Sequence, residues 1–219
     1  DLYAFKNEKI NDSIGVIVNI GHNITTVSLF NKGIIVKNSI LQMGGSNITN
    51  DLSYIFKLDN LDAEMVKEKF AVASSNYASC NDIIEIKNIK LNQKEVSEVV
   101  ESRLDEILTF VKKEIFSLTD KQISYIIVTG GTVNMNCFDV ELKKILGDNI
   151  SIGKVKMLGA TENRYSSVIG NVVYYINKLK LKGENSTMVD STNETILSSP
   201  KKNTNETMIS KVINFFANE

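Results

Sequence analysis

The chain is poor in the residues that build metal sites and disulfide frameworks. Its 219 residues include two cysteines, one histidine, one proline and no tryptophan. Cys80 and Cys137 belong to no C-x-x-C or Cys/His ligand pattern, which favours two reduced thiols over a disulfide or a metal site. No apolar run approaches the ~18 residues that a membrane-spanning helix needs. We therefore expect a soluble protein of the cytosol.

An excess of charge of one sign is also missing. The chain has 25 Lys and Arg against 26 Asp and Glu, for a formal net charge of −1. Nucleic-acid binding needs a clustered basic surface, whereas the lysine pairs at 112–113 and 143–144 are isolated and typical of solvated helix faces. The sequence thus predicts no nucleic-acid partner. With 42% apolar residues, it can bury the core of one large domain or two small ones.

Apolar periodicity predicts three strands followed by alternating helices and strands. The three strands are expected at 15–20, 25–30 and 34–41. The segment AEMVKEKF predicts a short helix with Asp62 as its N-cap, and an apolar stripe predicts a long helix over 93–116. Next we expect a strand at 123–128, a helix at 136–146, a strand at 150–155 and a helix at 165–178. This order predicts an α/β fold in which a mixed sheet is flanked by helices.

Two glycine-containing corners stand at strand ends, where open α/β sheets bind their ligands. The first is the hairpin GVIVNIGHNITTVSLF at 15–30, which could cradle a phosphate. In the second, YIIVTGGTVNMNCF at 125–138, a strand runs through Gly130 and Gly131 into a helix. Glycine lets the backbone approach a ligand closely. Either corner alone would also fit a tight turn that binds nothing.

In unbroken order, these corners and three further segments resemble the second half of an actin-like ATPase of the bacterial FtsA cell-division family. The hairpin is similar to the family's second phosphate hairpin, and ENRYSSVIGNVVYYI to its terminal helix. The segment leading into the family's second small subdomain is resembled by ILQMGGSNITNDLSYIF. The family's E-x-x-K helix, which contacts adenosine, is resembled by LDAEMVKEKF, and its adenosine motif is resembled by IIVTGGTVNM. The resemblance implies an ATP site with the candidate residues Gly21, His22, Asn23, Gly45, Glu64, Lys67, Gly130, Gly131 and Thr132. For Glu64 and Lys67, a solvated i,i+3 ion pair is the alternative.

The resemblance covers about residues 8 to 178 and implies an actin-like ATPase lobe of the ribonuclease H-like class. Residues 1–178 would form the second lobe. Approximately 8–48 and 121–178 would be its large subdomain, and 49–120 an inserted small α+β subdomain. In the family, ATP lies between two lobes, and the first lobe's phosphate hairpin has no counterpart in this sequence. We expect ATP with Mg²⁺ to bind in a complete two-lobed protein, and weakly or not at all in this chain alone.

The hairpin departs from the family pattern where the metal and the phosphates would be held. Asn19 stands where the family has an acidic residue, and His22 and Asn23 replace glycines. Asparagine is a much poorer partner than aspartate for a hard cation, and the added side chains stand where backbone N–H groups would face phosphate. We assign no catalytic residue and expect at most weak ATPase activity. We expect a nucleotide-binding assembly protein rather than an enzyme.

The composition changes after residue 178. Residues 179–206 are rich in Asn, Ser, Thr, Glu and Lys, which predicts a disordered linker. Residues 207–219 predict an amphipathic helix, whose apolar face could by pattern alone anchor in a membrane or dock on protein. FtsA-like proteins end in a membrane-targeting helix, so the resemblance implies an anchor on an anionic membrane surface, with the apolar residues Met208, Ile209, Val212, Ile213, Phe215 and Phe216.

The resemblance implies a cell-division adaptor at the cytoplasmic face of the cell membrane, at the division site. It would bind the C-terminal tail of FtsZ through the small subdomain, self-associate into protofilaments, tether the FtsZ ring to the membrane and help to recruit division proteins. Two alternatives of the same fold remain open. One is a scaffold of the pilus-assembly type, and the other is a chaperone-like or sugar-kinase-like ATPase.

Overall fold

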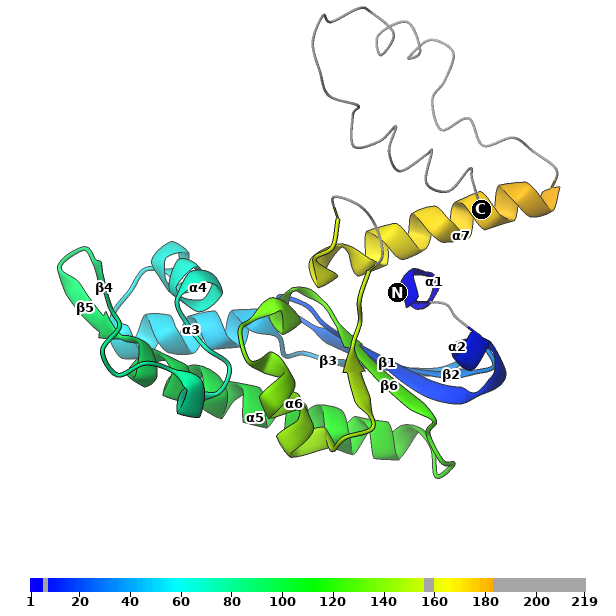
Figure 1. The fold of residues 1–219 in the computed structure, drawn as a ribbon, viewed down its shortest axis with the longest axis horizontal. Helices are drawn as coiled ribbons and strands as arrows, with labels where there is room; N and C mark the ends of the chain where they lie inside the picture. Colours follow the sequence, from blue (N-terminus) through cyan, green and yellow to red (C-terminus); the bar gives the residue numbers. More distant parts are fainter. Residues whose placement is uncertain (6–7, 156–159, 183–219) are drawn as a thin grey trace, which may run out of the picture.

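The computed structural model describes residues 1–5, 8–155 and 160–182. Its centre is a five-stranded mixed sheet with the strand order β3-β2-β1-β6-β7 (Figure 1). The first three strands form an antiparallel meander, and β6 pairs parallel to both β1 and β7. The strand bounds are β1 Ile14–Ile20, β2 Thr25–Asn31, β3 Ile34–Leu41, β6 Tyr125–Thr129 and β7 Ile150–Ile152.

The two faces of β1 supply two separate cores, because successive side chains of a strand point to opposite faces. Val16, Val18 and Ile20 are fully buried in the main core. This core also holds the buried faces of α3 (Gly45–Phe56), α5 (Gln93–Leu118) and α6 (Phe138–Leu146). Ile17 points the other way, into a smaller cluster under α1 (Leu2–Phe5) and α2 (Glu8–Asp12). Helices therefore cover both faces of the sheet, as Figure 1 shows.

Two groups of elements extend from this sheet. On one side lie α4 (Asn60–Lys69) and a separate hairpin of β4 (Ile83–Ile86) and β5 (Ile89–Asn92), from which α5 runs back beneath the sheet (Figure 1). On the other side, α7 (Ser166–Lys182) packs on α1, with the rings of Tyr3 and Tyr174 5.2 Å apart. Among the described residues, no helix is both long and apolar enough to cross a membrane.

Most of the expected elements are confirmed, but several boundaries were wrong. The strand expected at 123–128 is Tyr125–Thr129, and the helix expected at 165–178 is Ser166–Lys182. The helix of AEMVKEKF begins at Asn60, and its N-cap is Asp59, whose carboxylate accepts a hydrogen bond from the Asp62 amide at 2.8 Å. The helix expected from residue 136 begins at Phe138, because the chain first forms a 3₁₀ turn at Gly131–Asn134. The strand expected to reach residue 155 ends at Ile152.

Candidate functional site

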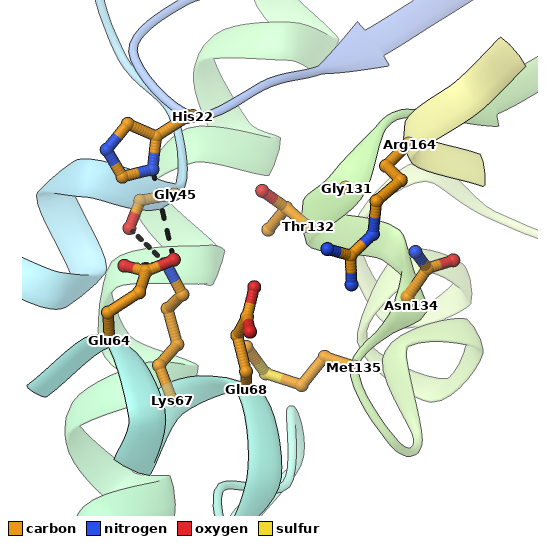
Figure 2. Close-up of a pocket in the computed structure, with 10 residues that line it drawn as sticks. All are labelled: His22, Gly45, Glu64, Lys67, Glu68, Gly131, Thr132, Asn134, Met135 and Arg164. Carbon is orange, nitrogen blue, oxygen red and sulfur yellow. Dashed lines mark hydrogen bonds and ion pairs between the residues drawn. The ribbon is translucent and has the colours of Figure 1, made fainter. Parts of the chain in front are cut away.

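A cavity of about 160 Å³ opens where five segments meet. These segments are the β1–β2 hairpin, the start of α3, helix α4, the turn after β6 and the 3₁₀ turn that precedes α7 (Figure 2). Three of them come from segments that the sequence marked as nucleotide motifs. The residues that line the cavity are His22, Gly45, Glu64, Lys67, Glu68, Gly131, Thr132, Asn134, Met135 and Arg164.

The hairpin is hydrogen-bonded to the first turn of α3. The Gly45 amide donates to the Gly21 carbonyl at 2.9 Å, and the Ser46 amide donates to the His22 carbonyl at 2.7 Å. This close approach requires glycine at position 44, since a Cβ there would lie 2.6 Å from both carbonyl oxygens. The hairpin carbonyls thus satisfy helix amides that have no partner within the helix.

In the second glycine corner, Gly130 packs against the end of β1 and Gly131 faces the cavity. Gly130 has φ +105°, and a Cβ on it would lie 2.3 Å from the Ile20 carbonyl oxygen, so only glycine fits against the end of β1. Gly131 faces the cavity instead, where the nearest atom to an added Cβ is 3.8 Å away. The Thr132 hydroxyl donates to the Gly21 carbonyl at 3.3 Å and links the two corners.

Lys67 is a buried cation with all its near partners inside the protein. Its ammonium lies 2.6 Å from a Glu64 carboxylate oxygen, and it donates to the Thr49 hydroxyl at 2.9 Å and the Gly45 carbonyl at 3.2 Å. The residue is only 6% exposed, so a solvated surface pair is wrong for this lysine. Lys67 therefore fixes α4 against the start of α3 rather than offering its charge to the cavity.

Glu64 carries one of the negative charges that face the cavity. Burial alone would raise the pKa of this carboxyl group, but hydrogen bonds from Lys67 and Thr49 outweigh burial and hold the pKa below its usual range. Glu64 is ionised at neutral pH and can accept hydrogen bonds from a ligand's hydroxyl groups. His22 stands over the same carboxylate, 4.0 Å from it, with a side chain that is 59% exposed (Figure 2).

Three of the nine predicted site residues do not line the cavity. Gly21 and Gly130 lie behind it and shape the two corners, and Asn23 is exposed on the hairpin. The other six are brought together around one space. The predicted membrane-anchor residues, Met208, Ile209, Val212, Ile213, Phe215 and Phe216, lie outside the described residues.

Four lining residues escaped the sequence analysis: Glu68, Asn134, Met135 and Arg164. Glu68 could have been found, because a residue four positions after Glu64 lies on the same helix face. Arg164 lies in ENRYSSVIGNVVYYI, a segment identified in the sequence only as a terminal helix, and the fold brings this segment to the turn after β6. There the Asn163 amide donates to the Asn134 side-chain oxygen at 3.3 Å. The guanidinium of Arg164 lies across the cavity from Glu64 (Figure 2).

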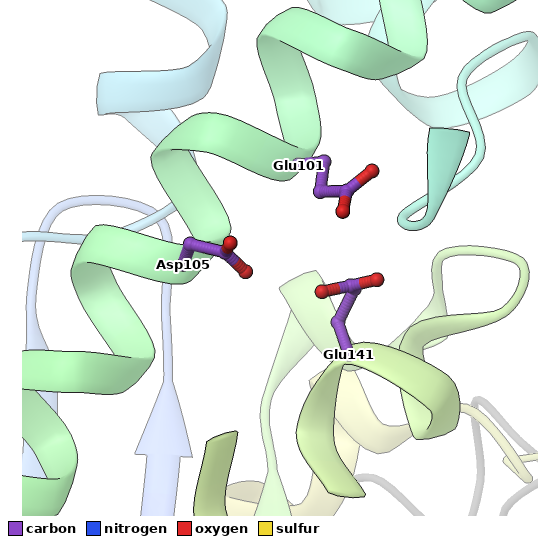
Figure 3. Close-up of side chains that lie close together, drawn as sticks. All are labelled: Glu101, Asp105 and Glu141. Atoms are coloured by element: carbon purple, nitrogen blue, oxygen red, sulfur yellow. The ribbon is translucent and has the colours of Figure 1, made fainter. Parts of the chain in front are cut away.

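Away from the cavity, three carboxylates from two helices lie close enough together to hold a metal ion. Glu101 and Asp105 come from α5, and Glu141 from α6 (Figure 3). The ammonium of Lys144 lies 2.8 to 3.1 Å from an oxygen of each of them. This lysine already supplies the positive charge that the cluster needs, so the cluster fastens α5 to α6 and we assign no metal to it.

This cluster should make stability fall in acid. Burial alone would raise the pKa of Glu101, but hydrogen bonds from Lys144 and Ser75 outweigh it and lower the pKa to about 2, from an ordinary value of 4.5. Because the folded-state pKa is the lower one, the stabilisation is complete above about pH 5 and is lost as the pH falls from 4.5 towards 2. Urea unfolding across this range should show the loss.

A Lys144→Met variant should be destabilised at neutral pH and less so in acid. Removing the cation leaves three carboxylates side by side, so we expect the free energy of unfolding at pH 7 to fall by about 1–2 kcal/mol, a value reduced for the half-exposed lysine. The deficit should shrink at pH 4, where protonation relieves the repulsion. Lys143→Met, at the exposed neighbouring position, is the matched control. A deficit that grows in acid would contradict this assignment.

The comparisons with known proteins agree on family and fold. Residues 16–170 match the family model of cell division protein FtsA. The FtsA protein of Bacillus subtilis (strain 168) is 28% identical over 187 residues, which cover 81% of this chain and 42% of that protein. The chain therefore spans less than half the length of this relative.

Solved structures show the same fold at lower identity. MreB5 of Spiroplasma citri, in a crystal structure with bound ADP, has a TM-score of 0.65 at 15% identity, over 83% of this chain and 59% of that one. The PilM–PilN type IV pilus biogenesis complex contains a chain with a TM-score of 0.55 at 16% identity, over 81% of this chain and 48% of that one. The expected actin-like α/β fold is confirmed. With its family model matched across most of the described sheet and helices, this chain belongs to the FtsA family of cell-division proteins.

Proposed function

We propose that this chain is the second lobe of a nucleotide-binding cell-division adaptor. The observation that carries the proposal is the cavity, because six of the nine residues predicted to hold ATP line it together, in a chain of the FtsA family. MreB5, which has a related fold, is bound to ADP in its crystal structure. Bound nucleotide would control the self-assembly of this protein, and the protein would not act mainly by hydrolysing ATP.

The cavity walls suit the nucleoside part of ATP. The carboxylates of Glu64 and Glu68 lie on one side and can accept hydrogen bonds from ribose hydroxyl groups (Figure 2). Arg164 and Asn134 lie on the other side, where the planar guanidinium can stack on a base and the amide can hydrogen-bond its edge. Gly131 leaves room for the base beside the backbone.

The adaptor role extends this proposal to the membrane and to FtsZ. Its support is the family and the apolar periodicity of the sequence at 207–219. The helix would carry only one basic residue on its polar face, Lys211, and each such residue adds about 1 kcal/mol near an anionic surface. One chain should therefore bind reversibly, and self-association would convert many weak anchors into a stable attachment.

Two exposed apolar surfaces are available for partners. In the predicted small subdomain, Tyr54, Ile55 and Leu61 of α3 and α4 are 51–84% exposed, and we propose that the FtsZ tail docks on this subdomain. At the edge of the main sheet, Ile34, Ile35 and Val36 of β3 are 54–69% exposed. An exposed strand edge is a template for pairing with another chain, and we propose that it contributes to self-association.

Removing residues 207–219 should abolish binding to vesicles that contain anionic lipid. The variant lacks the apolar face that would enter the headgroup region, while every described element of the lobe is retained. Sedimentation with vesicles measures the bound fraction, and circular dichroism of the shortened chain checks that the fold is intact. Equal pelleting of the two chains would reject the anchor.

A further inference from the structure

The family pairs ATP with Mg²⁺, but the donors at the end of β1 do not fit this ion. Asn19 lies where the metal's acidic partner would be expected, and its side-chain amide nitrogen donates to the Asp1 carboxylate at 2.9 Å and to the Ser167 hydroxyl at 3.1 Å. Its side-chain oxygen faces Gly130, since a Cβ on that glycine would lie 2.7 Å from it. The Asp1 carboxylate also accepts hydrogen bonds from Ser166 and Ser167, at 2.9 and 2.8 Å. These groups are bonded to one another, and none of them lines the cavity.

The carboxylates of the cavity do not supply the missing ligand. Mg²⁺ is usually held by one or two carboxylates together with phosphate oxygens, in a nearly octahedral arrangement. Glu64 is already paired with the buried Lys67 ammonium at 2.6 Å, so a second cation on this carboxylate would meet a like charge. Glu68 follows on the same helix, on the wall that we assign to the nucleoside.

The lysine and helix amides that would be the strongest phosphate donors near the cavity already have partners in the protein. The Lys67 ammonium is satisfied by Glu64, Thr49 and Gly45. The first amides of α3, which could receive an anion, donate to the hairpin carbonyls. Arg164 lies on the opposite wall and forms an ion pair with Glu162 at 2.5 Å.

From these contacts we infer that the lobe binds adenine nucleotides through the nucleoside, with an affinity that neither Mg²⁺ nor the number of phosphates changes. The inference rests on the proposed function, because it concerns the same cavity. It specifies the ligand class further: adenosine and AMP should bind this lobe as well as ADP and ATP. Control by nucleotide would then depend on what the phosphates contact outside this lobe.

Titrations followed by nuclear magnetic resonance test this inference on the full chain. Adenosine, AMP, ADP and ATP are each added in MgCl₂ and in EDTA, and the amide shifts of Gly131 and Thr132 are followed. We expect weak binding, on the order of millimolar, with dissociation constants within about threefold of one another. A tenfold or greater gain for ATP in MgCl₂ would overturn the inference and leave the proposed function standing. If no adenine compound shifted these amides, both would fail.

An Asn19→Asp variant gives a second, independent readout. It places a carboxylate against that of Asp1, in place of an amide that donates at 2.9 Å. In EDTA its melting temperature should fall by about 3 °C or more, and MgCl₂ should restore it, whereas the parent chain should not respond. The matched control is Asn38→Asp, at an exposed site on β3 where the side-chain oxygen accepts from Ser28 at 2.7 Å and remains an acceptor. A parent chain that MgCl₂ stabilises as much as the variant would contradict the inference.

Discussion

Replacing Gly131 with arginine should remove the adenine-nucleotide binding that we propose for this lobe. Gly131 lines the cavity, and the space before it is open to a ligand. An arginine side chain would project into that space. It would also place a second guanidinium close to that of Arg164, because a Cβ at position 131 would lie 3.8 Å from the Cβ of Arg164. We expect no saturable shifts of the cavity amides when ADP is added, under conditions in which the parent chain gives them.

The matched control for this result is Gly131→Ala. A methyl group at this position meets only ordinary van der Waals distances, so the alanine variant should retain affinity within about threefold. The two variants separate the volume of the side chain from the mere loss of glycine. A folded Gly131→Arg protein with unaltered nucleotide affinity would remove the second glycine corner from the site.

Replacing Gly130 with alanine should have the largest effect on stability. The added Cβ would lie 2.3 Å from the Ile20 carbonyl oxygen and 2.7 Å from the Asn19 side chain, with a φ of +105°. Overpacking costs about 1–3 kcal/mol, and the backbone strain costs about the same again. We therefore expect the free energy of unfolding to fall by about 2–6 kcal/mol in urea denaturation.

Gly147→Ala separates these two contributions. Gly147 also has a positive φ, +91°, but nothing lies within 4 Å of an added Cβ. This variant should lose only the strain energy, about 1–3 kcal/mol. Equal losses at the two positions would mean that Gly130 is not held against the end of β1.

The periodic elements of the fold could be predicted from the sequence, because each carries its own pattern. The strand at 34–41 has the expected bounds, and the long helix exceeds its prediction by only two residues, ending at Leu118. Boundaries set by a single hydrogen bond could not be predicted so well. Asp59 and Asp62 are both plausible caps in sequence, and only the extended backbone of Asp59 shows which one accepts the helix amide.

The cavity lining could be predicted where candidate residues stand at the glycine corners. His22, Gly131 and Thr132 are such residues, and they reach the cavity. Arg164 lies in the segment ENRYSSVIGNVVYYI, but that pattern indicates a terminal helix and not a site residue. Its neighbours in space are about 30 residues away in sequence. The burial of Lys67 was hidden for a similar reason, since its partners Thr49 and Gly45 belong to another helix.

The measurement that tests the adaptor proposal most directly is the recruitment of FtsZ to vesicles. FtsZ is sedimented with vesicles containing anionic lipid in the presence of this chain, or of the same chain without residues 207–219. We predict that FtsZ is found in the pellet only with the full chain. If the full chain pelleted and FtsZ remained in the supernatant, the division-adaptor role would be contradicted for this lobe, and a scaffold for another membrane assembly would become the better proposal.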